Sequence, residues 1–191
     1  MAVVDGILGG VFDPPHLGHV ALARVGVREL GLDRLLVLVV ADPGHKRATV
    51  PAEIRLELTR LAFADFPESA VELDRHPRTV DSLEERRLDD AVFMVGADEL
   101  ADFESWKEPG RVLELARLGV AMRPGTTRDE LEAVRRRLSA PDRVVAFEME
   151  PVAISSSDVR ARVARCEPID DLVPHRVAEE ISRLGLYATS E

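Results

Sequence analysis

Five short runs of apolar residues recur along the chain and restrict the folds open to it. The runs are VVDGIL (3–8), LLVLVV (35–40), AVFMV (91–95), LGVAM (118–122) and VVAF (144–147). Runs that are apolar on both faces are typical of parallel strands covered by helices on both sides of the sheet. The pattern therefore predicts an α/β fold with a doubly wound, mostly parallel sheet and right-handed crossovers.

The segments between these runs carry helical signals. Apolar residues at helical spacing follow the first run, at Val20, Ala23, Val27 and Leu30. They predict a helix that begins near Gly18 and stops at Gly31. A second helix is expected after Pro51 and a third from Thr126, where a threonine precedes an amphipathic segment.

Length and composition suit one domain. With 191 residues, of which 46% are hydrophobic, the chain can bury a sizeable core without disulfides or structural metal ions. Its lone cysteine, Cys166, permits no internal disulfide and no cysteine cluster for zinc. No apolar run approaches the roughly 20 residues of a membrane span, and the N-terminal residues lack the pattern of a signal peptide. We therefore expect a cytoplasmic protein.

The formal net charge of −10 at pH 7 limits the partners. Polymeric nucleic acid and anionic membranes both require a dominant positive field on the protein. Neither is expected as a partner here. An anionic ligand would have to meet a local concentration of positive charge.

The segment GGVFDPPHLGHV (9–20) joins the first expected strand to the first expected helix. A doubly wound sheet binds nucleotide phosphates at this point, because the helix presents free backbone amides and the positive end of its dipole. Gly9 and Gly10 would let a ligand approach the backbone closely. His16 and His19 would face one side of the first helical turn, where imidazoles can donate to phosphate oxygens.

The same segment has other interpretations. Its glycines match neither the G-x-G-x-x-G fingerprint nor a P-loop. A single histidine at a helix start is more often a surface or capping residue. Asp13 with two histidines could imitate a metal site, but no helical H-x-x-x-H spacing or third clear ligand follows. We predict a phosphate-binding turn and no metal site of the protein's own.

Two signatures in the right order resemble a known superfamily. GGVFDPPHLGH resembles the G-x-F-D-P-x-H-x-G-H signature of the nucleotidyltransferases with the H-x-G-H motif, and ISSSDVRAR (154–162) resembles their I-S-S-S/T-x-x-R segment. On its own, SSSDVR is more often an ordinary helix cap. The combination implies a Rossmann-like nucleotidyltransferase fold.

The middle and the end of the chain are similar to bacterial nicotinate mononucleotide adenylyltransferases. ADPGHKRATVPAEIRLELTRLAF resembles their P-P-H-K segment and R-x-x-M-x-x-L-A helix, and RTVDSL (78–83) their Y-T-V-D-T-L. VFMVGADELADFESWKEP resembles their G-A-D-x-L...W segment, and LVPHRVAEEISRLGLY their C-terminal pattern. The resemblance implies a single nucleotidyltransferase domain over 1–191, with a C-terminal helical part from about residue 155 packed on it.

The resemblance also implies roles for individual residues. Catalytic roles fall on His16, His19, Lys46 and Arg160. ATP-binding roles fall on Gly9, Gly10, Phe12, Gly96, Asp98, Ser155 and Ser156. Mononucleotide-binding roles fall on Thr79, Trp106 and Arg78. Mg²⁺ would arrive with ATP. Without the motifs, Lys46 would be a solvated loop charge, Asp98 a helix cap and Trp106 a core residue.

Three residues depart from the family pattern. Val11 stands where Thr or Ser is usual, Gly44 replaces the second proline of P-P-H-K, and Arg78 replaces the tyrosine before T-V-D. Arg78 would add positive charge beside the nicotinate carboxylate. A charge-assisted hydrogen bond there could favour the acid over the amide.

The reaction implied by the resemblance moves AMP from ATP to nicotinate mononucleotide and gives deamido-NAD and pyrophosphate, a step of NAD biosynthesis. Two alternatives transfer the adenylyl group to nicotinamide mononucleotide or to phosphopantetheine. A third is a catalytically silent nucleotide-binding module that kept the fold. The sequence leaves the oligomeric state open, homo-oligomers included.

Overall fold

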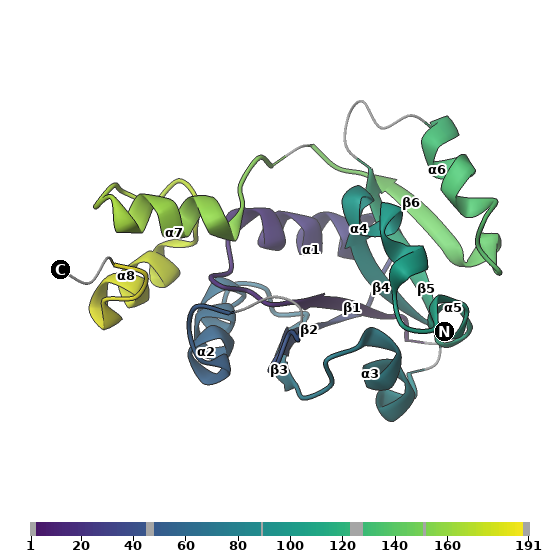
Figure 1. The fold of residues 1–191 in the computed structure, drawn as a ribbon, viewed down its shortest axis with the longest axis horizontal. Helices are drawn as coiled ribbons and strands as arrows, with labels where there is room; N and C mark the ends of the chain where they lie inside the picture. The colour runs from purple at the N-terminus through teal and green to yellow at the C-terminus, as the bar shows by residue number, and fades with distance from the viewer. Residues whose placement is uncertain (1–2, 45–47, 89, 123–127, 151, 189–191) are drawn as a thin grey trace.

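Six parallel strands form one sheet in the order β3-β2-β1-β4-β5-β6 (Figure 1). The strands are β1 (Asp5–Gly10), β2 (Arg34–Val40), β3 (Ser69–Asp74), β4 (Ala91–Gly96), β5 (Ala116–Met122) and β6 (Val144–Glu148). The computed structural model describes residues 3–44, 48–88, 90–122, 128–150 and 152–188, without the side chains of 98 and 128–130. The order reverses between β1 and β4, which confirms the doubly wound, Rossmann-like fold.

Helices cover both faces of this sheet. They are α1 (Leu17–Leu30), α2 (Ala52–Ala62), α3 (Thr79–Arg86), α4 (Ala97–Ala101), α5 (Pro109–Leu115), α6 (Arg128–Arg135), α7 (Ser156–Ala164) and α8 (His175–Leu184). Leu8 of β1 belongs to a core shared with α1, α2, α7 and α8, whereas its neighbour Ile7 belongs to a core shared with α3, α5 and α6. The side chains of successive strand residues thus pack into the cores on opposite faces of the sheet.

The predicted helices lie close to their expected places. The first runs from Leu17 to Leu30 and ends at Gly31, and the second directly follows Pro51. The third begins at Arg128 within the described residues. Its expected threonine caps, at 126 and 127, lie outside them.

Strand β3 was missed, and its sequence explains why. SAVELD alternates exposed and covered residues and pairs only with β2, at the edge of the sheet. A search for continuous apolar runs finds central strands and overlooks an edge strand of this kind. The first strand also starts later than expected, at Asp5, and includes both Gly9 and Gly10.

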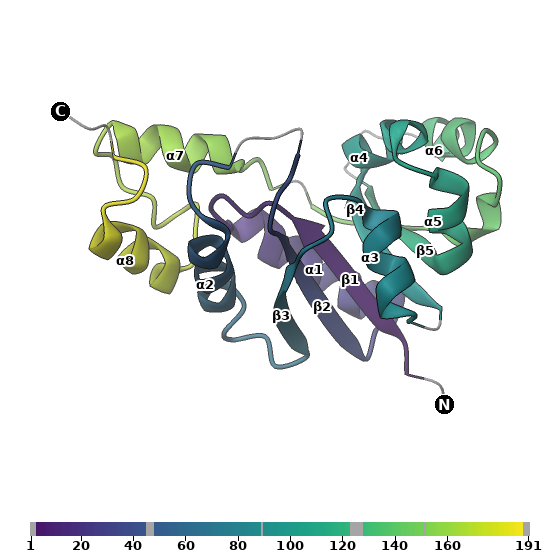
Figure 2. The ribbon, with the colours of Figure 1, turned by 60° about the horizontal axis from the view of Figure 1, so that its bottom comes forward.

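The C-terminal helices lie at one end of the long axis of the molecule, far from α6 (Figures 1 and 2). Val159 of α7 and Val177 and Ile181 of α8 are almost fully buried in the same core as Leu58 of α2. The C-terminal part is helical and shares this core with α2, while the single-domain organisation stays a prediction. Among the described residues, no helix has the length and apolarity to cross a membrane.

Candidate active site

A cavity of about 1550 Å³ opens at the carboxyl ends of the strands, around the end of β1. The predicted site residues that line it are Gly9, Gly10, Phe12, His16, His19, Arg78, Thr79, Gly96, Trp106, Ser155, Ser156 and Arg160. Lys46 lies outside the described residues, as does the side chain of Asp98, whose backbone is in α4. Segments at both ends of the chain therefore meet in one place.

Phe12 explains part of the glycine pattern in the turn. Its ring is 2% exposed, and a Cβ at Gly10 would lie 2.9 Å from it. A Cβ at Gly9 would lie 3.1 Å from the ring of Phe93. A side chain at Gly10 would therefore displace Phe12, whose ring meets His19 edge-on at 4.9 Å between centroids. The glycines serve packing as well as any ligand.

The two histidines form a stacked pair at the start of α1. Their ring centroids are 3.6 Å apart with an interplanar angle of 28°. The backbone N–H of His16 donates to Nδ1 of His19 at 3.1 Å, so Nδ1 must be unprotonated. In the neutral ring the proton is then on Nε2, which becomes a hydrogen-bond donor. The helix cap thus selects the tautomer that suits an anionic ligand.

Burial keeps both imidazoles neutral at physiological pH. Loss of solvation lowers the pKa of His16 to about 4, although nearby Asp158 opposes the shift. Burial, with the neighbouring His16, also lowers the pKa of His19 well below its usual range. Nδ1 of His16 is buried and has no hydrogen-bond partner among the described residues. The tautomer of His19 with its proton on Nε2 is therefore the one present at physiological pH.

This arrangement predicts that stability falls as the pH drops. The unfolded chain binds a proton at His16 near pH 6.5, whereas the folded chain resists it until about pH 4. The stabilisation is present above about pH 6.5 and is lost between these two values, by about 2 kcal/mol from pH 7.5 to pH 5. Urea unfolding across this range measures it. An equal slope in a His16→Gln variant would contradict the assignment.

Helix α7 brings the second signature against the turn. The Ser156 hydroxyl donates to the carbonyl of Pro14 at 2.8 Å, and Arg160 donates to the carbonyl of Asp13 and, at 3.1 Å, to Ser157 Oγ. Ser155 caps the helix by accepting from the backbone N–H of Asp158 at 3.1 Å. Ser155 therefore caps the helix in this structure. To contact a phosphate, as predicted, its hydroxyl would have to give up its bond with Asp158.

The residues predicted to bind the mononucleotide lie along another wall of the cavity. Thr79 opens α3, directly after the exposed Arg78. Trp106 is half-buried and meets the ring of Phe93 edge-on, with centroids 6.0 Å apart. A half-buried indole that is packed against Phe93 and lines the cavity is compatible with stacking by a flat ring. The core and ring-platform interpretations of Trp106 are therefore compatible.

One departure from the family pattern, Gly44, acquires a physical explanation. Gly44 has φ 61° and donates its backbone N–H to Asp42 Oδ1 at 3.0 Å. Proline could adopt neither that φ nor that bond. Val11 accepts a hydrogen bond from Arg55 at 2.7 Å through its backbone carbonyl, which any residue could supply, so the structure does not explain the valine side chain.

Arg55 is the main residue that sequence reasoning overlooked. It is 1% exposed, and its guanidinium donates to the carbonyls of Val11, Val40, Ala41 and Val50 at 2.7–3.2 Å. It therefore ties the ends of β1 and β2 to the segment before α2. The R-x-x-M-x-x-L-A resemblance contained Arg55, but helical periodicity alone cannot distinguish a buried arginine from an exposed one.

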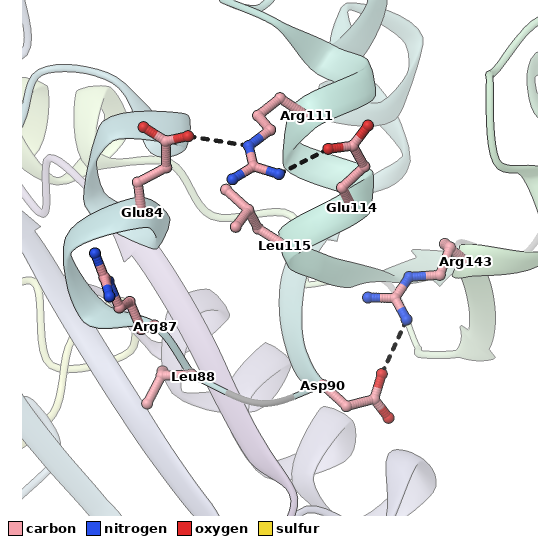
Figure 3. A pocket seen from close by; sticks show the side chains of 8 residues that line it. All are labelled: Glu84, Arg87, Leu88, Asp90, Arg111, Glu114, Leu115 and Arg143. Atoms are coloured by element: carbon pink, nitrogen blue, oxygen red, sulfur yellow. Dashed lines mark hydrogen bonds and ion pairs between the residues drawn. The ribbon is translucent and has the colours of Figure 1, made fainter.

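A second cavity, of about 680 Å³, lies at the opposite end of the strands from the first, near residues that precede β4, β5 and β6 (Figure 3). Arg111 contacts Glu84 at 3.0 Å and Glu114 at 2.7 Å, while Arg143 contacts Asp90 at 3.1 Å. These arginines are already paired with carboxylates. The cavity's three basic side chains, Arg87, Arg111 and Arg143, are balanced by three acidic ones, Glu84, Asp90 and Glu114, so the described lining has no formal net charge.

The fold and the cavity are those expected of a nucleotidyltransferase, with the turn that holds His16 and His19 at the point where the strand order reverses. Residues 7–162 match the cytidylyltransferase-like family. A probable nicotinate-nucleotide adenylyltransferase of Thermomicrobium roseum is 43% identical over 197 residues, covering 97% of this chain and 92% of the relative. A Thermus thermophilus protein of the same name is 41% identical over 191 residues, covering 95% and 98%.

The chain belongs to the nicotinate-nucleotide adenylyltransferases of the cytidylyltransferase-like family. The fold agrees with that of a Plasmodium falciparum nicotinic acid mononucleotide adenylyltransferase, solved in complex with NaAD. The TM-score is 0.77 at 16% identity, and the match covers 97% of this chain and 98% of the other.

Proposed function

We propose that this nucleotidyltransferase moves AMP from ATP to nicotinate mononucleotide, giving deamido-NAD and pyrophosphate. The observation that carries the proposal is the meeting of His16 and His19 with Ser156 and Arg160 in a cavity that also contains Thr79 and Trp106. Phosphate donors and a ring platform in one cavity suit the joining of two nucleotides. The relatives' shared name supports the choice of acceptor.

No protein nucleophile is needed for this reaction. A phosphate oxygen of the mononucleotide, already ionised at neutral pH, attacks the α-phosphorus of ATP. The new P–O bond forms as the bond to the β-phosphate oxygen breaks, and the electron pair leaves with pyrophosphate. The protein has to align two polyanions and stabilise the charge that moves onto the leaving group.

His19 is the best-placed donor for that charge. Its Nδ1 is occupied by the backbone N–H of His16, so its Nε2–H is free to donate toward the phosphates. Arg160 would exchange its bonds to Asp13 and Ser157 for phosphate oxygens, and Lys46 would add a further cation. Few cations, concentrated at one turn, allow a chain with a net charge of −10 to bind an anion.

Mg²⁺ would be bound by ATP itself. Among the described residues, no group of three or more His, Cys, Asp and Glu side chains could hold a metal ion, and the turn offers imidazole and guanidinium donors instead. Oxygen ligands are what Mg²⁺ prefers, and phosphates supply them. When bound, the ion would neutralise phosphate charge, while the protein groups orient the chain of phosphates.

We predict that Arg78 favours the acid over the amide. It is exposed beside Thr79 on the cavity wall, where a guanidinium can form a bidentate ion pair with a carboxylate but donates only a weaker hydrogen bond to the oxygen of an uncharged amide. Arg78→Ala should lower kcat/KM for nicotinate mononucleotide about tenfold and lower that for nicotinamide mononucleotide much less. An unchanged ratio of the two efficiencies would remove Arg78 from the explanation.

One assay separates the proposal from its rivals. The purified protein is given ATP, Mg²⁺ and, in turn, nicotinate mononucleotide, nicotinamide mononucleotide or phosphopantetheine, and pyrophosphate and the adenylylated product are measured. The proposal requires the fastest release with nicotinate mononucleotide. Faster pyrophosphate release with another acceptor would assign that acceptor as the substrate instead. No pyrophosphate release with any of the three would favour a catalytically silent module. A cytoplasmic location fits substrates of this kind.

A further inference from the structure

Asp13 connects three distant parts of the chain beneath the phosphate-binding turn. It is 5% exposed. Its carboxylate accepts the Tyr187 hydroxyl at 2.8 Å on Oδ1 and the backbone N–H of Thr49 on Oδ2. Its carbonyl accepts Arg160. The turn is thus held by the C-terminal segment, by the segment before α2 and by α7.

The negative charge of Asp13 lies beside the expected site of the ATP phosphates. A carboxylate next to a polyanion site opposes binding unless its charge is compensated and directed away from the ligand. Asp13 interacts with the positive charge of Arg55, and both carboxylate oxygens have hydrogen-bond donors. If either donor were lost, the carboxylate could rotate toward the phosphates.

Tyr187 is itself held in place for this contact. It has φ 63°, a conformation that aromatic residues seldom adopt without surrounding support. Its ring is half-buried and packs against the core that contains α2 and α8. Burial and the bond to Asp13 raise the pKa of the Tyr187 hydroxyl above its usual range, so it stays a donor at physiological pH.

We infer that Tyr187 is a positioning residue for ATP: through Asp13, the C-terminal segment holds the phosphate-binding turn and Thr49 in the arrangement that accepts the triphosphate. The inference rests on the proposed function, because it needs ATP as the ligand. It assigns to the C-terminal tyrosine a part in substrate binding, although its hydroxyl contacts Asp13 rather than the cavity.

The test is calorimetric titration of the whole protein with ATP and Mg²⁺. Tyr187→Phe keeps the ring and loses the hydroxyl, so the melting temperature should change little. The Kd for ATP should rise about tenfold, while the KM for the acceptor stays the same. In an Asp13→Asn background, Tyr187→Phe should have little further effect, since the charged acceptor is already gone.

Leu186→Ala is the matched control. It removes packing from the same segment but keeps the Tyr187 hydroxyl, so it should lower the melting temperature and leave the Kd for ATP unchanged. Equal ATP affinity in the original protein and Tyr187→Phe would overturn the inference alone. Failure of the original protein to bind ATP would overturn the proposed function and this inference with it.

Discussion

Replacing His19 with alanine is expected to lower turnover by roughly 10²–10³ while leaving the fold intact, by analogy with removal of one preorganised donor to a developing charge. His19 is half-buried at the first turn of α1, between the rings of Phe12 and His16. Its Nε2–H is the donor that the substitution removes. Steady-state kcat with saturating ATP and acceptor measures the effect.

Two further substitutions separate the donor from the helix cap. Asparagine can still accept the His16 backbone N–H in place of Nδ1, but it lacks a donor at the Nε2 position, so His19→Asn should be as slow as alanine yet more stable. Glutamine places an amide N–H near that position, so His19→Gln should recover part of the rate. His175, 76% exposed on α8, provides a control. Near-normal turnover in His19→Ala would refute the catalytic assignment.

Loss of Arg55 should give the largest effect on stability. Arg55→Met keeps much of the side-chain length but leaves four partly buried carbonyls without the guanidinium. We expect the free energy of unfolding to fall by about 3–5 kcal/mol. For a chain of this size that corresponds to a melting temperature lower by roughly 6–20 °C. Thermal and urea unfolding measure both quantities.

Arg60→Met, on the same helix, is the matched control. Its side chain is 55% exposed and makes one ion pair with Glu57 at 3.9 Å, so its loss should change stability by less than about 0.5 kcal/mol. Arg55→Lys tests geometry, because one ammonium has three donors and cannot reach four carbonyls. Equal stability of Arg55→Met and Arg60→Met would show that the buried guanidinium contributes nothing.

Much of the fold follows from local pattern. Central strands are buried on both faces and must be apolar throughout, so β2, β4 and β5 are visible in the sequence as runs. Strand β6 lies at the other edge of the sheet but is visible too, because VVAF (144–147) is apolar throughout. The helix between β1 and β2 is visible because its apolar residues recur at helical spacing. Strand β3 has one partner strand and a half-exposed surface, so its residues alternate and resemble a polar connection.

The candidate site was predictable to the extent that it is contiguous. His16 and His19 are three residues apart on one helical turn, and Ser156 and Arg160 are four apart on another, so each pair is readable within its own segment. Their meeting in one cavity was an implication of family resemblance, and the topology places them there. The protonation state of the histidines depends on burial, which no local pattern specifies.

By itself, the sequence determined the parallel α/β architecture and the turn of glycines and histidines after the first strand, and its resemblance to a known family indicated the class of reaction. Only the tertiary structure decided that Arg55 is buried beneath that turn and that Tyr187 donates to Asp13, which is 174 positions away in the chain. The reason is physical. Periodicity reports which face of an element is covered, whereas the partner of a buried polar group is set by elements that packing brings together from distant parts of the chain.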